Sequence, residues 1–245
     1  MAEKILKETS HRCRLPDRVG RLRGRQYCRY VRENVVLLKT KHRNKLAPWP
    51  LGLSLLLGWA IQWCSPMLQA EGLLEASDAF DRGEFVTALE LYDVLAQDGD
   101  ARAQYRLGMM YEQGLGTDPD TKIAANWYAQ AAGQESPEGL AALSALHLKG
   151  AGVIQNFKES VRLNQQAAAL GYAPAQYSLG VAYANGVGTF RDPVKAHMWF
   201  NIASASGYPN AMQSRERIAS SMGEAAVARA QDKAKTCIDR DFSNC

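Results

Sequence analysis

The chain has 245 residues, of which 47% are hydrophobic, so it is long enough to bury a sizeable core. Its net charge of +4 conceals an asymmetry: residues 1–70 hold 14 basic and 4 acidic residues, whereas residues 71–245 hold 15 basic and 21 acidic residues. Nucleic-acid binding needs positive charge on the folded surface, and the acidic balance of the second part therefore excludes a nucleic-acid partner.

Residues 1–45 form a basic leader with little apolar periodicity. Two explanations stay open for it. The leader is either a long cytoplasmic segment in front of an export signal, or sequence that lies upstream of the true start codon. In the second case translation begins at a non-AUG codon, for which Val31, Val35 and Leu38 are candidates. N-terminal sequencing of the expressed precursor distinguishes the two.

Residues 46–70 predict an export signal. An uncharged apolar run, residues 51–63 (LGLSLLLGWAIQW), follows a group of lysines and arginines that ends at Lys45. A basic region followed by a short apolar region and a small residue is typical of a secretory signal, and we expect cleavage after Ala70. The alternative is retention as an N-terminal anchor, although a spanning helix needs about 20 apolar residues. We therefore expect a periplasmic protein, or one anchored in the inner membrane by this segment alone, with the following residues outside the cytoplasm.

From residue 101 onward the same residue types recur every 36 residues without a gap. Leu107 recurs as Leu143 and Leu179, and a glycine pair recurs as Gly114/Gly116, Gly150/Gly152 and Gly186/Gly188. A fixed period in the thirties indicates a solenoid of stacked supersecondary units. The sequence predicts an all-α solenoid with repeats near residues 101–136, 137–172 and 173–208.

Each repeat is predicted to contain two helices. In the first repeat, residues 101–113 place apolar residues at helical spacing, and Gly114 provides the left-handed conformation that ends such a helix. Asp118 or Asp120 is placed to cap a second helix near residues 121–132. The tryptophans of the second helices, Trp127 and Trp199, are assigned to the core.

The pattern AQYRLGMMYEQGLG followed by AANWYAQAA, and its third copy AQYSLGVAYANGVG followed by AHMWFNIAS, resembles the Sel-1-like repeat, a relative of the tetratricopeptide repeat. The middle copy departs from it at the positions that correspond to Gly108 and Trp127. Residues 80–96 resemble the second half of a tetratricopeptide repeat, and residues 220–236 resemble a capping helix. The resemblance implies a repeat solenoid over residues 71–236, followed by a tail of residues 237–245.

This resemblance implies a non-enzymatic scaffold that binds a protein, as a peptide or a helix, on the concave face of the solenoid. Transferring the tetratricopeptide groove positions onto this chain gives the following candidates: Arg102, Tyr105, Met109, Glu112, Gln113, Glu138, Leu148, Lys149, Tyr177, Val181 and Asn185. Tyr105 and Tyr177 lie two periods apart and are candidate paired anchors. The alternative is that either tyrosine packs against the next repeat.

The cysteines are consistent with export. Cleavage after Ala70 removes three of the five cysteines and leaves Cys237 and Cys245, which an oxidising compartment would join in a small disulfide loop. The alternative is a pair of free thiols on a frayed tail. Two thiols without a nearby histidine cannot complete a tetrahedral metal site, so we expect neither a metal nor another cofactor.

The sequence contains no recognisable nucleophile paired with a base, and we do not expect an enzyme. His147 replaces a repeated tyrosine and is interpreted as a core histidine rather than a base. Two alternatives to the exported scaffold are kept. One is a membrane-anchored assembly factor for polysaccharide or secretion machinery. The other is a β-lactam-binding or hydrolysing enzyme, as described for some secreted relatives, although their paired helix cysteines are missing here.

Overall fold

The structure is a computed structural model that describes residues 70–242 and residue 245. The basic leader and the apolar run of the predicted signal lie outside the described residues. Ala70, after which cleavage is predicted, is the first described residue and already belongs to a helix.

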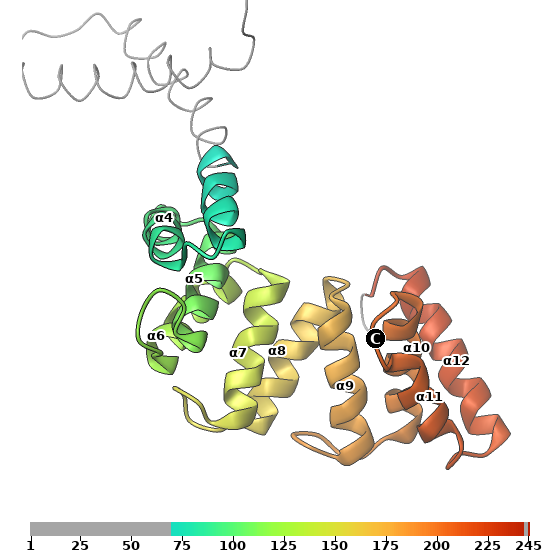
Figure 1. Cartoon of the computed structure of the whole chain (residues 1–245). Helices are drawn as coiled ribbons and strands as arrows, with labels where there is room; N and C mark the ends of the chain where they lie inside the picture. The colour runs from blue at the N-terminus through green and yellow to red at the C-terminus, as the bar shows by residue number, and fades with distance from the viewer. Residues whose placement is uncertain (1–69, 243–244) are drawn as a thin grey trace, which may run out of the picture. The chain divides into compact units, whose positions relative to one another are not determined.

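The described part of the chain consists of helices joined by turns. Residues 70–81 are helical, and the helices that follow are α4 (Phe85–Gln97), α5 (Ala101–Gln113), α6 (Thr121–Gly133), α7 (Pro137–Lys149), α8 (Phe157–Ala169), α9 (Ala173–Asn185), α10 (Pro193–Ala205), α11 (Ala211–Ala219) and α12 (Glu224–Asp239). Consecutive helices from α4 to α11 pack against each other, and α12 packs against α10. Figure 1 shows these helices as one array, coloured from teal to red. The predicted all-α solenoid of stacked helix pairs is confirmed.

The helix ends follow from the repeated residues. Gly114, which follows α5, has φ +70°, and its N–H donates to the carbonyl of Met110, as expected for a left-handed helix end. Of the two capping candidates, the structure selects Asp120, whose side chain accepts from the N–H groups of Lys122 and Ile123. Asn156 and Asp192 cap α8 and α10 at the same repeat position.

The second glycine of each pair joins one repeat to the one before it. A Cβ on Gly116 would lie 2.5 Å from the carbonyl oxygen of Phe85, where α4 begins. Gly152 meets Thr121 at the start of α6 in the same way, and Gly188 meets Phe157 at the start of α8. These glycines are therefore required for the loop of each repeat to lie directly on the backbone of the preceding one.

The glycine inside the first helix of a repeat makes room for an aromatic ring. A Cβ on Gly108 would lie 2.8 Å from the ring of Tyr128, and one on Gly180 would lie 2.5 Å from the ring of Phe200. The middle repeat changes both positions together. Ser144 replaces the glycine and donates a 2.9 Å hydrogen bond to the carbonyl of Ser160, while the smaller side chain of Asn164 replaces the ring.

The buried side chains form three clusters along the array. The first joins the helix of residues 70–81 to α4 and α5, the second centres on α6 and α7, and the third joins α7 through α10 to α12. Trp199 is 5% exposed and belongs to the third cluster, as predicted. Trp127 is only half-buried and packs against the edge of the first cluster, because the fully buried aromatic of α6 is its neighbour Tyr128.

The two ends of the array differ in detail from the prediction. Residues 80–96 were assigned to half of a repeat, but they span the end of one helix, a turn at Gly83 with φ +76°, and most of α4, so that a whole helix pair precedes the first repeat. Residues 220–236 were assigned to one capping helix. Residues 220–223 instead form the turn between α11 and α12, and α12 continues to Asp239, beyond the predicted start of the tail.

Cys237 and Cys245 form a disulfide, with their Cα atoms 5.3 Å apart. Cys237 lies within α12 and is buried. Between the two cysteines, Phe242 packs against the third cluster and approaches Gly171, in the turn between α8 and α9. The tail therefore contacts the turn between α8 and α9, which lies two helix pairs earlier in the chain. None of the helices within residues 70–242 combines the length and the apolar character that a membrane-spanning helix needs.

Candidate functional site

The predicted partner-binding residues lie on the sides of α5, α7 and α9 that face away from the buried residues of these helices. In α9, for example, Leu179 and Tyr183 are buried, whereas Val181 is 37% exposed and Asn185 is exposed. Leu148 of α7 is 45% exposed. Helix α5 contacts α7 as well as α6, which brings the residues of the first two repeats together. We call this surface the first-helix face.

Tyr105 and Tyr177, the candidate anchors, are half-buried, and each packs against rings of its own repeat. The hydroxyl of Tyr177 also lies 3.2 Å from the hydroxyl of Ser214 in α11, in the helix pair that follows. The ring of Tyr105 lies 5.8 Å from that of Tyr128. The ring of Tyr177 lies 5.4 Å from that of Phe200 and 5.0 Å from that of Tyr208. Packing therefore holds both rings in place, while part of each remains accessible.

Tyr172 and Tyr208 belong to the same surface, and the sequence analysis did not select them. They occupy one repeat position, immediately before the next helix pair, and both are half-buried. Burial raises the pKa of Tyr172, and the nearby Tyr105, Glu138 and Tyr208 raise it further. Tyr105, Glu138 and Tyr208 come one from each of the three repeats. The signal that would have found them is the recurrence of Gly-Tyr at residues 171–172 and 207–208.

Three charged residues of the first-helix face, Arg102, Glu112 and Glu138, are held by local bonds. Glu112 accepts a 2.8 Å hydrogen bond from the hydroxyl of Tyr128, whose pKa is raised by burial and then by this carboxylate. Glu138 accepts a 3.1 Å bond from the hydroxyl of Ser136, which caps α7. The guanidinium of Arg102 lies 3.4 Å from the carboxylate of Asp100.

The remaining candidates fall into two groups. Met109 is half-buried and packs against both the first and the second cluster, so that it contributes to the contact between repeats. Gln113, Lys149 and Asn185 are exposed and end their helices, directly before the glycine turns. The face is therefore a mixture of half-buried aromatic rings and exposed apolar and polar side chains.

The buried histidine is His197, not His147. His197 is 2% exposed, and burial, together with the nearby Arg215, lowers its pKa. His147 is half-buried, and its Nδ1 lies 3.2 Å from the carbonyl oxygen of Ile154. Within residues 70–242 and residue 245, no three His, Cys, Asp or Glu side chains are grouped so that they could hold a metal ion.

Known proteins resemble the chain in its repeats. Residues 101–136, 137–172 and 173–208 each match the Sel1 repeat family. Chitin synthase regulatory factor 3 of Schizosaccharomyces pombe is 37% identical over 130 residues, which cover 52% of this chain but only 14% of that protein. The chain thus spans about a seventh of this much longer relative.

Two solved bacterial structures are also similar. One is c5321, described as a protective antigen of uropathogenic Escherichia coli strains with an SLR fold. It matches with a TM-score of 0.59 and 27% sequence identity, and the matched region covers 64% of this chain and 34% of the c5321 chain. The other is a Sel1 repeat protein of Oxalobacter formigenes, with a TM-score of 0.52 and 26% identity, covering 64% of this chain and 63% of its own. The helix pairs, the glycine contacts and these matches agree: residues 101–208 of the chain form three Sel1 repeats.

Proposed function

We propose that this protein is a non-enzymatic scaffold that binds a protein partner, as an extended peptide or a helix, on its first-helix face. The observation that supports this most strongly is the group of tyrosines contributed by all three repeats, Tyr105, Tyr172, Tyr177 and Tyr208. Rigid aromatic side chains provide a large contact area and lose little conformational entropy on binding. Their own packing holds them in position before a partner arrives.

We further propose that the repeats act outside the cytoplasm, after export through the N-terminal segment. The disulfide between Cys237 and Cys245 is consistent with an oxidising compartment. The basic and apolar segments that precede Ala70 have the order of a secretory signal. Intact-mass measurement of the protein from the periplasmic fraction tests both points, since it reports the cleavage site and the oxidation state of the two cysteines.

A second candidate function is that of an anchored assembly factor for polysaccharide-synthesising machinery. One observation favours it: the similar protein of Schizosaccharomyces pombe is named a regulatory factor of chitin synthase, a polysaccharide-synthesising enzyme. Cell fractionation separates the two candidates. Release by osmotic shock supports a free exported scaffold, whereas retention in the membrane fraction supports the anchored factor.

The binding proposal is tested by comparing two double variants of the full chain in a pull-down from envelope extract. Leu148→Glu with Val181→Glu places charge on the first-helix face, where the two residues are 45% and 37% exposed. Ile123→Glu with Ile238→Glu changes residues of comparable exposure, 39% and 43%, on α6 and α12, which do not belong to this face. We expect the first variant to lose the captured protein and the second to retain it, with equal melting temperatures. Equal capture by both variants would contradict the proposal.

A further inference from the structure

Two consecutive repeats expose a large apolar side chain at the same loop position. Ile154 in the loop between α7 and α8 is 89% exposed, and Phe190 in the loop between α9 and α10 is 93% exposed. The first repeat has Asp118 at this position. A single exposed apolar residue is ordinary, but two of them on neighbouring loops form a patch that indicates an interaction surface.

The contact between repeats places these loops side by side. A Cβ on Gly188, two residues before Phe190, would lie 2.5 Å from the carbonyl carbon of Phe157, which follows the loop of Ile154. Phe157 is itself 42% exposed. We call the row of Ile154, Phe157 and Phe190 the loop edge. The row is short and protruding.

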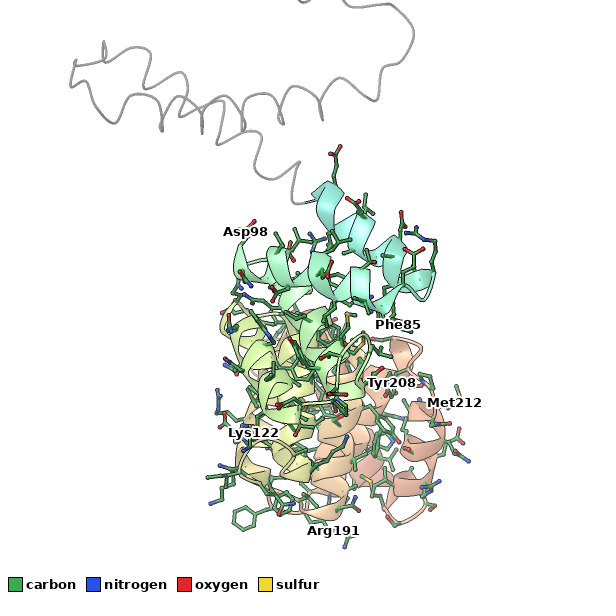
Figure 2. All side chains as sticks on the ribbon, turned by 60° about the vertical axis from the view of Figure 1, so that its left-hand side comes forward. Phe85, Asp98, Lys122, Arg191, Tyr208 and Met212 are labelled. Atoms are coloured by element: carbon green, nitrogen blue, oxygen red, sulfur yellow. A yellow bond between two sulfur atoms is a disulfide. The ribbon has the colours of Figure 1, made fainter. Side chains whose placement is uncertain are left out.

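Basic residues flank the loop edge. Lys149 ends α7, Lys158 follows Phe157, and Arg191 follows Phe190; all three are exposed. Neither lysine forms an ion pair with the described residues, and the Arg191 side chain donates only to the carbonyl of Ala184. Figure 2 shows Arg191, in the loop between α9 and α10, at the bottom of the view and Met212 apart from it, at the right side.

Two acidic residues beside the loop edge are already engaged. Asp192 caps α10 by accepting from the N–H groups of Val194 and Lys195. Glu159 forms an ion pair with Arg162. The loop edge thus combines exposed apolar tips with cations that lack an acidic partner.

We propose that the loop edge of the second and third repeats contacts the surface of an anionic lipid bilayer, with Ile154 and Phe190 inserted at the headgroup level. Protruding tips need a partner that deforms around them, which a bilayer does. Interfacial binding strengthens with the apolar area inserted and with electrostatic attraction to anionic lipids, and the loop edge offers both. This contact is separate from the N-terminal segment. It shares Lys149 with the first-helix face but needs no protein partner.

The test places one environment-sensitive fluorescent amino acid at position 190 of the full chain. Matched proteins carry it at position 154, and at positions 170 and 212, whose native Leu170 and Met212 are 50% and 58% exposed away from the loop edge. Each protein is mixed with vesicles of phosphatidylcholine alone or with added phosphatidylglycerol. The fluorescence reports the surroundings of the labelled position. Vesicle binding through the N-terminal segment would therefore not by itself brighten a label at position 190 or 154.

We expect the label to brighten at positions 190 and 154 with phosphatidylglycerol vesicles, and not at 170 or 212. Lys149→Gln and Lys158→Gln should each lower the ratio of inserted to free label about fivefold, while circular dichroism is unchanged. Salt near 1 M, where the Debye length is about 3 Å, should also lower the ratio of inserted to free label. No brightening at 190, the same response at 170, or an equal response to neutral vesicles would overturn the proposal.

Discussion

Gly188→Ala tests the contact that joins successive repeats. Its backbone has φ +69°, and an alanine Cβ would lie 2.5 Å from the Phe157 carbonyl carbon and 3.0 Å from a methyl group of Val161. Favourable carbon contacts lie at about 3.5–4.0 Å, so the loop must move by about 1 Å or more. Gly207 is the matched control, because it has φ +73° and nothing within 4 Å of the added Cβ.

The left-handed conformation alone costs alanine about 1–2 kcal/mol, which both variants share. Displacing a packed neighbour adds about 1–3 kcal/mol in Gly188→Ala only. For a folded region of this size, a difference of about 2 kcal/mol lowers the melting temperature by about 4–8 °C relative to Gly207→Ala. Thermal unfolding followed by circular dichroism measures it. Equal melting temperatures would refute the account of how the repeats are joined.

Three further predictions concern the core, its buried histidine and the tail. Gly180→Ala should destabilise the fold by about 1–2 kcal/mol in a urea titration, because the ring of Phe200 must move. Adding Phe200→Leu to this variant should recover part of the lost stability. The control Gly133→Ala, whose added Cβ would have nothing within 4 Å, should be neutral or slightly stabilising. Burial lowers the pKa of His197, so the unfolded chain binds a proton more readily than the folded chain, and stability should fall as the pH drops below about 6.5. Urea titrations at pH 7.5 and 5.5, roughly one unit on either side of the ordinary histidine pKa, should show a smaller loss of stability in His197→Leu than in the parent. An equal loss in both would contradict the role given to His197. Cys237→Ser with Cys245→Ser should lower stability by no more than about 3 kcal/mol in a thermal melt, since the disulfide closes only a short loop. A larger loss would mean that the disulfide also stabilises helices outside the tail.

The repeats could be predicted from the sequence because their determinants are local and recur. The glycine after α5 ends that helix at the predicted residue, since a left-handed backbone needs no information from elsewhere in the fold. The aspartate that caps α6 is also a local choice, although only the structure separates Asp120 from Asp118.

The packing between helices was harder to predict. The tryptophan position is predicted to fill the core, but in the first repeat the adjacent Tyr128 does so, because Gly108 leaves space for its ring. Tyr172 and Tyr208 were missed on the first-helix face for a similar reason. Whether a residue in a turn reaches a neighbouring repeat depends on how the helix pairs rotate against each other, which the 36-residue period does not specify.

The central claim, that the first-helix face binds a protein partner, is tested most directly by photo-crosslinking in the producing cells. A photoreactive amino acid replaces Val181 or Leu148 on the face, and Ile123 of α6 or Ile238 of α12 away from it, in otherwise identical full chains. We predict one discrete crosslinked species from positions 181 and 148 and none from 123 or 238. Crosslinks of equal yield from all four positions, or from 123 and 238 alone, would contradict the claim.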